Sequence, residues 1–308
     1  MSEIACVVKH TMLSSQQLRH SRGGSLRRFG PIPIVALLLG VLRAEPARAQ
    51  ERAYFNTYDH YLEEPGNLEI AVASTNGLPK NGNAAYSAPW LELEYGLTGW
   101  WTAELYLESI TTRGDGNGFA GWRWENRFRP LRSEHRVNPV LYIEYEHTNE
   151  ASRIQKEIVG SGPIAYEPIA DLQAVHTHEL EAKLILSSVV GVWNISENVI
   201  VEKNVSEAEG VEFGYSVGVS RQIGTLASAT SCHFCAENFV VGVEAYGGLG
   251  STEGFAVGEQ RHYIAPVVGW HVTPRTTIKA SAGIGLTHVS DHALLRVGVS
   301  YELPGVRR

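Results

Sequence analysis

Charged side chains recur at every second position in several short stretches of this sequence, where they have the clearest capacity for chemistry. Apolar residues occupy the intervening positions. If such stretches pair as strands, opposite charges lie about 5 Å apart at Cβ and can form ion pairs between strands. The cluster would be either a constriction that selects solutes by charge and size, or a structural network filling a narrow space. The candidates are Glu104, Glu108, Arg123, Glu125, Arg127, Glu144, Glu146, Glu181 and Lys183.

A second candidate site is the pair Cys232 and Cys235, separated by His233 and Phe234. No second pair exists to complete a four-cysteine zinc site, and haem attachment would need histidine after the second cysteine. We expect a disulfide that closes a small loop. A redox or metal role that includes His233 is the alternative.

The histidines and one acidic loop offer weaker candidates. His288 and Ser290 have a spacing that resembles the catalytic pair of the outer-membrane phospholipase, but no partner motif for a nucleophilic serine is evident. The stretch 115–118 (DGNG) has the look of a calcium loop but lacks its distal ligands, so a tight hairpin is expected. His176 and His178 could share a metal or simply be exposed. The sequence therefore predicts no enzyme, no cofactor and no assigned metal site.

The elements that carry these residues show the period-two alternation of β-strands and no long helical periodicity. The clearest is the last, where Leu295, Val297, Val299, Tyr301 and Leu303 alternate with small or charged residues. Single-chain outer-membrane barrels have an even number of strands, as found here. Twelve strands are predicted, near 67–75, 88–95, 100–111, 118–129, 138–148, 177–187, 193–204, 211–222, 238–248, 261–272, 276–286 and 292–303.

The polar faces of these strands favour an all-β transmembrane antiparallel up-and-down barrel over a soluble periplasmic β-protein. Glutamate, arginine, glycine and serine together suit a wet lumen with lipid outside. The tight turns 96–99 and 273–275 are expected on the periplasmic side, and the long 149–176 segment outside. Aromatic residues near strand ends would form interface girdles. These are Trp90, Tyr95, Trp100, Trp101, Trp270 and Tyr301.

The N-terminal 49 residues have the anatomy of a secretory signal, with basic residues before a short apolar run at 31–42. We place cleavage after Ala49, with Met12 as a possible true start. Seven of the 26 basic and two of the 33 acidic residues fall in 1–49, which leaves a net charge near −12. That charge argues against nucleic acid as a partner. The expected domains are the signal peptide (1–49), a periplasmic N-terminal segment or plug (50–66), the barrel (67–303) and a short tail (304–308).

The last strand also carries a pattern that resembles the assembly signal of outer-membrane barrels, formed by Arg296, Gly298, Tyr301 and Leu303. The expected partners are the barrel-assembly machinery, outer-membrane lipid, lipopolysaccharide and small solutes. The expected location is the outer membrane of a Gram-negative bacterium.

Four segments resemble the outer-membrane transporters grouped with the MetA pathway of phenol degradation: 91–107 (LELEYGLTGWWTAELYL), 121–130 (GWRWENRFRP), 138–146 (NPVLYIEYE) and 283–301 (GIGLTHVSDHALLRVGVSY). The resemblance implies a barrel that passes small compounds, aromatic compounds among them. We expect a passive, porin-like channel with a charged lumen, and a preference for cations because glutamate is in excess. The alternatives are a non-conducting structural or interaction barrel and, third, a lipid-active enzyme.

Overall fold

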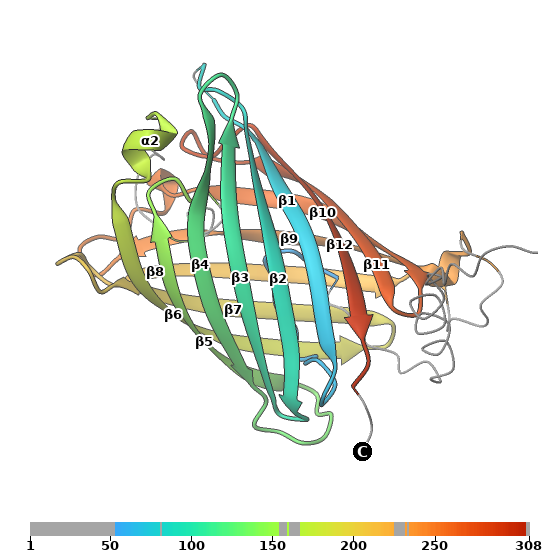
Figure 1. Cartoon of the computed structure of the whole chain (residues 1–308). Coiled ribbons are helices and arrows are strands. Elements are labelled where there is room, and N and C mark those ends of the chain that lie inside the picture. Colours follow the sequence, from blue (N-terminus) through green and yellow to red (C-terminus); the bar gives the residue numbers. More distant parts are fainter. Residues whose placement is uncertain are drawn as a thin grey trace, which may run out of the picture. The chain divides into compact units, whose positions relative to one another are not determined.

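The chain forms a closed antiparallel β-barrel in which each strand pairs with its neighbours in sequence and β12 closes onto β1 (Figure 1). The structure is a computed structural model that describes residues 53–80, 82–153, 159, 167–224, 232 and 234–305. The strands in this part of the chain are β1 (Leu68–Leu78), β2 (Tyr86–Thr98), β3 (Trp101–Thr112), β4 (Gly116–Phe128), β5 (Asn138–Asn149), β6 (His176–Val190), β7 (Trp193–Asn204), β8 (Glu212–Gln222), β9 (Phe239–Ser251), β10 (His262–Thr273), β11 (Thr276–Gly285) and β12 (Ala293–Leu303). The predicted fold class is confirmed, whereas the predicted signal peptide lies outside the described residues.

The two ends of the barrel differ in what they carry. Leu68 at the start of β1 pairs with Leu303 at the end of β12, so the two chain ends of the barrel share one end, here called the terminal end. The short β2–β3 and β10–β11 turns also lie there. The β8–β9 connection, from Gln222 to Phe239, lies at the same end, so the expectation of short turns there is wrong for this connection. The opposite end, here called the loop end, carries α2 (Ile169–Leu172) (Figure 1).

The outward face of the strands is apolar. Trp124, Ile143 and Val199 are each more than half exposed, because alternate residues on a strand point to opposite faces. An apolar exterior that extends over most strands is unfavourable in water and stable in lipid. The protein is therefore a transmembrane barrel, which places it in a bacterial outer membrane.

The aromatic residues expected at the membrane interfaces divide between the two faces. Tyr95, Trp100 and Tyr301 are outward and 43–45% exposed. Trp90 does not belong to a girdle, because it faces inward in the middle of β2 and meets Phe55 edge-on, with ring centroids 6.5 Å apart. None of the helices in the described residues is long and apolar enough to cross a membrane.

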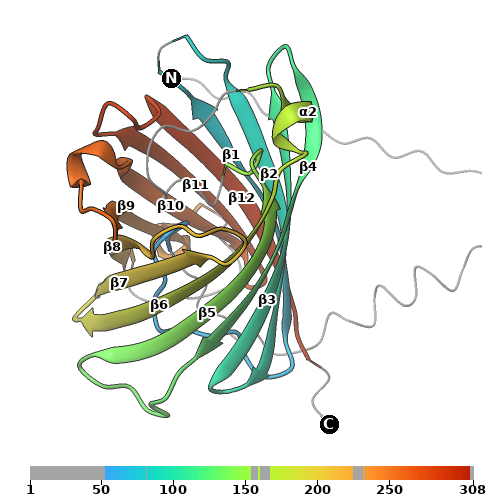
Figure 2. The same ribbon diagram turned by 90° about the vertical axis from the view of Figure 1, so that its left-hand side faces the viewer.

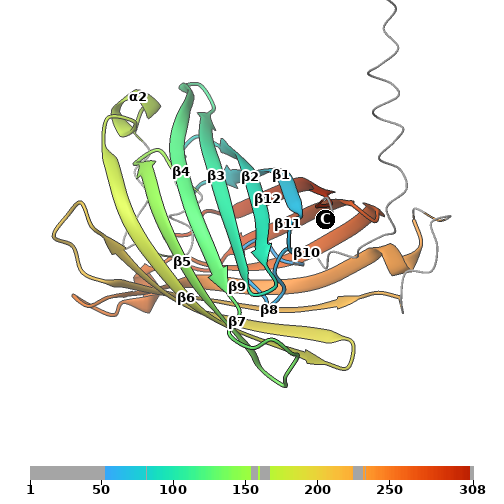
Figure 3. The same ribbon diagram turned by 60° about the horizontal axis from the view of Figure 1, so that its bottom comes forward.

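Residues 53–66, here called the inner segment, run inside the ring of strands before β1 begins (Figures 2 and 3). Tyr54 and His60 are fully buried, and Tyr58 is nearly so. The segment has no strand or helix of its own. It enters β1 through Gly66, whose N–H donates to the carbonyl of Gly96 at 2.7 Å.

Small residues on the wall make room for the inner segment. A Cβ added to Gly218 would lie 2.6 Å from the ring of Tyr54, which is closer than real Cβ contacts allow. On β12, a Cβ added to Gly298 would lie 2.9 Å from that of Ala73 and 3.6 Å from the ring of Phe55. The glycines of this wall are thus matched to the aromatic side chains that pack on it.

The β5–β6 connection closes part of the loop end. Its residues Ala151, Ile169 and Leu172 are buried in an apolar cluster with Tyr86 and Tyr263 from the barrel wall. Burial of that many apolar groups stabilises the infolded position of this connection. Described parts of the chain therefore fill the barrel from both ends.

Candidate functional site: the charged lumen

A continuous row of glutamates crosses nine neighbouring strands of the lumen wall. Each glutamate is the register partner of the next one on the adjacent strand. All but the last are at least 90% buried against other parts of the barrel. In order around the wall from β12 to β8, the row is Glu302, Glu69, Glu94, Glu104, Glu125, Glu144, Glu181, Glu202 and Glu212.

Like charges directly opposite each other destabilise a sheet, so this row requires compensation. Arg123 and Arg127 flank Glu125 on β4, two residues to either side, and Lys183 stands two residues from Glu181 on β6. Because alternate residues share a face, all three bases point into the lumen beside the row. These bases join the middle of the row, from Glu94 to Glu181, in one buried ionic network.

Arg123 links three strands of the wall. Its Nε lies 2.5 Å from the carboxylate of Glu108 on β3, and its Nη1 lies 3.1 Å from that of Glu144 on β5. Its guanidinium also lies over the ring of Tyr106, 4.3 Å from the centroid. Paired and stacked guanidinium groups are favourable where water is excluded.

Arg127 and Lys183 hold the neighbouring carboxylates. Arg127 bonds to Glu94 and Glu104 through Nη2 and lies 3.1 Å from Glu125 through Nε. The Lys183 ammonium lies 2.7 Å from the Glu181 carboxylate.

The ring of Tyr142 lies beneath the Lys183 ammonium, with its centroid 4.0 Å away. Tyr58 of the inner segment approaches the same ammonium at 4.7 Å. The inner segment therefore shares in the network.

The structure brings the nine charged residues predicted from the sequence together in the lumen, but in a different pattern. Sequence reasoning expected opposite charges to face each other across strands. The expected ion pairs between adjacent strands do form, but along the row glutamate faces glutamate, and Arg123 bonds diagonally to Glu108 and Glu144 although its register partner on β5 is Glu146. The bonded pairs follow side-chain length rather than register, because arginine reaches further than one strand spacing.

A cavity lies between the inner segment and the wall. Its volume is about 80 Å³, which is room for several waters. Its lining combines aromatic rings, carboxylates and bases, and includes Phe55, Trp90, Glu144, Glu181, Lys279 and Arg296. The inner segment thus occupies part of the described lumen beside this cavity.

The contacts that anchor the inner segment were not predicted from sequence, although one of the wall residues involved, Glu125, was a lumen candidate. The carboxylate of Glu244 on β9 accepts hydrogen bonds from the backbone N–H groups of Phe55, Asn56 and Thr57, at 2.9–3.3 Å. The hydroxyl of Tyr58 donates to Glu125 at 2.8 Å. The partners in these contacts are separated by between 67 and 189 positions in the sequence, so no local sequence pattern identifies them.

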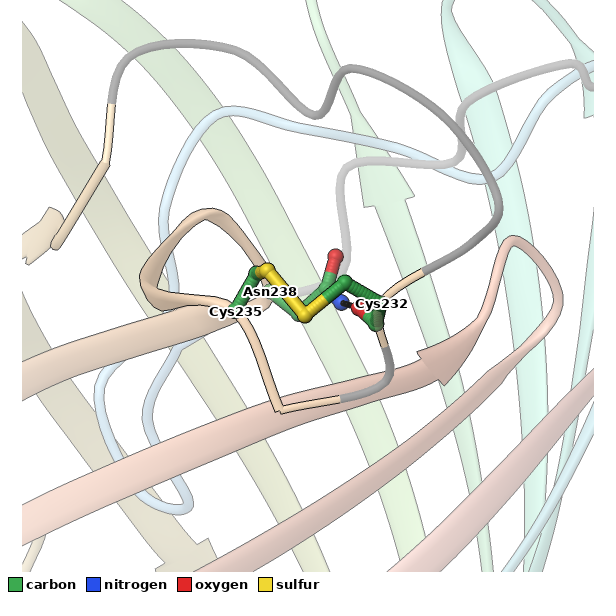
Figure 4. Close-up of a disulfide and its surroundings, with 3 residues drawn as sticks. All are labelled: Cys232, Cys235 and Asn238. Atoms are coloured by element: carbon green, nitrogen blue, oxygen red, sulfur yellow. Dashed lines mark hydrogen bonds between the residues drawn. A yellow bond between two sulfur atoms is a disulfide. The ribbon is translucent and has the colours of Figure 1, made fainter. Parts of the chain in front are cut away.

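Cys232 and Cys235 form a disulfide in the β8–β9 connection (Figure 4). The side-chain amide of Asn238 donates to the carbonyl of Cys232 at 2.7 Å. The β8–β9 connection that carries the pair lies at the terminal end. His233 lies outside the described residues.

Three further sequence candidates, Asp115, His288 and Ser290, occupy loop positions. The ring of His288 pairs with Glu259 at 3.2 Å, whereas the hydroxyl of Ser290 bonds to the backbone of His262. The structure does not join His288 to Ser290. Asp115 lies in the β3–β4 hairpin turn, where its carboxylate accepts the N–H of Ile169 at 2.7 Å and so holds α2.

Comparisons with known proteins place the fold. No family model and no curated protein sequence matches the chain. The COG4313 outer membrane channel from Pseudomonas putida F1 superimposes with a TM-score of 0.54 at 12% identity, over 81% of this chain and all of that one. The NanC porin gives 0.48 at 12% identity over 77% of this chain and all of that one, and the KdgM porin 0.47 at 7% identity over 77% and 99%. The chain thus shares its twelve-strand barrel fold with an outer-membrane channel.

Proposed function

We propose that the protein is a passive channel for small solutes with a preference for cations. The observation that carries this proposal is the row of nine glutamates around the lumen. Rings of acidic side chains favour cations at the entrance and in the pore of a channel. The bases Arg123, Arg127 and Lys183 are each paired with carboxylates of the network. Because the row has more glutamates than there are bases beside it, acidic charge remains in excess along the wall.

The inner segment sets the width of the path in this proposal. Its backbone is held to the wall by polar contacts with Glu244 and Asn198, and such contacts exchange readily with water. When the segment leaves the lumen, the cavity opens toward the terminal end. Conductance is then governed by the fraction of time that the segment spends outside.

A second candidate is a non-conducting structural barrel. The filled lumen favours it, because both the inner segment and the β5–β6 connection occupy the interior. In that case the glutamate network would serve only to hold these parts together.

Two finer features belong to the same proposal. The resemblance of four strand segments to the transporters grouped with the MetA pathway of phenol degradation supports membership of that family.

On β12, Arg296 and Gly298 face inward while Tyr301 and Leu303 face outward, which agrees with an assembly signal read by the barrel-assembly machinery from the lipid side.

The proposal is tested by reversal potentials in planar bilayers with a tenfold KCl gradient. We expect cation preference in the full chain and in a chain lacking residues 53–62, with a smaller reversal potential in Glu125→Gln and Glu144→Gln. Glu197→Gln is the matched control, because Glu197 is exposed on the outer face of β7. Equal reversal potentials in all variants would overturn the role of the row. A folded barrel without conductance, with or without the segment, would favour the structural alternative.

A further inference from the structure

Three histidines meet on the outer surface of the barrel near the loop end. His147 lies two residues before the end of β5, and His176 and His178 are the first and third residues of β6. His147 is the register partner of His178, and His176 shares the outward face because it is two residues away on the same strand. The topology thus brings three imidazoles from two strands to one place.

The imidazole ring of His147 lies close to the rings of the other two histidines. The ring centroid of His147 lies 4.5 Å from that of His178 and 5.5 Å from that of His176. Three imidazoles bound to one metal ion at about 2.0–2.1 Å from nitrogen place their centroids roughly 5 Å apart. The separation of the ring centroids is therefore close to that of a three-imidazole site, and the rings must turn to bring one nitrogen each to a shared ion.

The hydrogen bonding of two of these histidines leaves a ring nitrogen of each available as a metal ligand. Nδ1 of His147 is buried and makes no hydrogen bond within the described residues. Nδ1 of His178 bonds to the hydroxyl of Tyr145 at 2.6 Å, which leaves Nε2 as the other ring nitrogen of that histidine. A hydrogen bond on the second ring nitrogen is the usual means of orienting a metal-binding histidine.

The position of the cluster keeps it accessible to ions. Trp122 packs against Tyr145 and His147 on the outer face, with ring centroids 5.6 and 5.9 Å apart. Tryptophan and tyrosine prefer the membrane interface, so the histidines beside this pair lie near the level of the lipid headgroups and water.

We propose that His147, His176 and His178 form a binding site for a divalent transition-metal ion such as Zn²⁺, Cu²⁺ or Ni²⁺. Neutral imidazole suits these ions, and three nitrogen ligands leave a fourth position for water. His147 and His176 lie with nearly parallel rings, 14° apart, so binding turns these side chains to direct nitrogens at one point. Tyr145 is a positioning residue that holds His178.

The test uses the chain purified in detergent without a histidine tag and titrated with Cu²⁺. Electron paramagnetic resonance then shows whether nitrogen atoms bind the ion, which separates imidazoles from the carboxylates of the lumen. We expect one equivalent with nitrogen hyperfine structure. Each of His147→Ala, His176→Ala and His178→Ala should weaken binding at least tenfold, and Tyr145→Phe by about tenfold.

His288→Ala is the matched control, because His288 is exposed in another loop and pairs with Glu259. It should bind Cu²⁺ as the unaltered chain does. Gel mobility of the folded barrel, measured for every variant, separates lost binding from lost folding. The proposal is overturned if the folded triple variant binds as well as the unaltered chain, or if the unaltered chain shows no nitrogen-bound equivalent.

Discussion

The side-chain amide of Asn198 bonds to both backbone groups of Tyr58. Its Oδ1 accepts the N–H at 2.7 Å, and its Nδ2 donates to the C=O at 2.9 Å. One wall residue thus satisfies the backbone of the inner segment as a neighbouring strand would, at a point where the segment has no strand partner. The buried backbone of the segment is held by such side chains rather than by a sheet, which makes its position sensitive to single substitutions.

Replacement of Glu244 should release the inner segment. Glu244→Ala removes the acceptor of three backbone N–H groups, at a cost of about 1–3 kcal/mol for each buried donor left unsatisfied. We expect chymotrypsin to cleave the aromatic-rich segment at least tenfold faster, because proteolysis follows the population of the open state. Glu197→Ala on the outer face should leave the rate unchanged. An unchanged rate in Glu244→Ala would show that the carboxylate does not anchor the segment.

Gly218→Ala should displace Tyr54 from its place against β8, because the added Cβ would overlap its ring. Loss of the hydrogen bond from the Tyr54 hydroxyl to Asn194, 3.1 Å long, would follow. We expect higher conductance and faster cleavage of the segment in this variant. Gly269→Ala is the control, since its nearest neighbour would be an ordinary 3.8 Å contact. Equal behaviour of the two alanine variants would contradict the packing argument.

Arg123→Met should destabilise the barrel and raise its cation preference. The substitution leaves the carboxylates of Glu108 and Glu144 without the guanidinium that bonds them, and breaking a buried ion pair costs about 3–5 kcal/mol. Urea unfolding in lipid or detergent measures the loss of stability. Adding Glu108→Gln should recover part of it, whereas Arg113→Met in the exposed β3–β4 turn should have little effect. If the free-energy changes of Arg123→Met and Glu108→Gln were fully additive in the double variant, the two side chains would not be coupled.

The seating of the inner segment should strengthen as pH falls. Burial raises the pKa of the Glu63 carboxyl above its ordinary value, against the opposing effects of a hydrogen bond from Asn67 and the charge of Arg127. The segment therefore binds inside the barrel most favourably when Glu63 is protonated. As the pH rises from the ordinary pKa of a glutamate carboxyl to the raised pKa of Glu63, ionisation of Glu63 increasingly disfavours the buried position of the segment. Cleavage of the segment by a protease active across that range should slow on acidification. Glu63→Gln should flatten this dependence, and an identical profile in that variant would contradict it.

Strand positions were predictable from sequence because each strand carries its own alternation. The twelve predicted ranges agree with the structure to within a few residues, even for β10, where Pro266 lies within the strand as the register partner of Val243. The inward direction of Glu104 and Arg127 followed from the same alternation.

The glutamate row and the inner segment were not predictable in the same way. Register depends on turns and bulges, such as the shifts between Gly96 and Thr98 and between Glu108 and Ser109, which alternation within one strand does not contain. The inner segment has no period, and its partners lie far away in the sequence, so its place inside the barrel required the three-dimensional arrangement.

The most direct test of the channel proposal is single-channel recording of the full chain beside a chain that lacks residues 53–62. The proposal predicts small or infrequent conductance steps for the full chain and larger, longer-lived steps after the deletion, with cation preference in both. A deleted chain that is folded in the bilayer yet gives no steps would contradict the proposed channel.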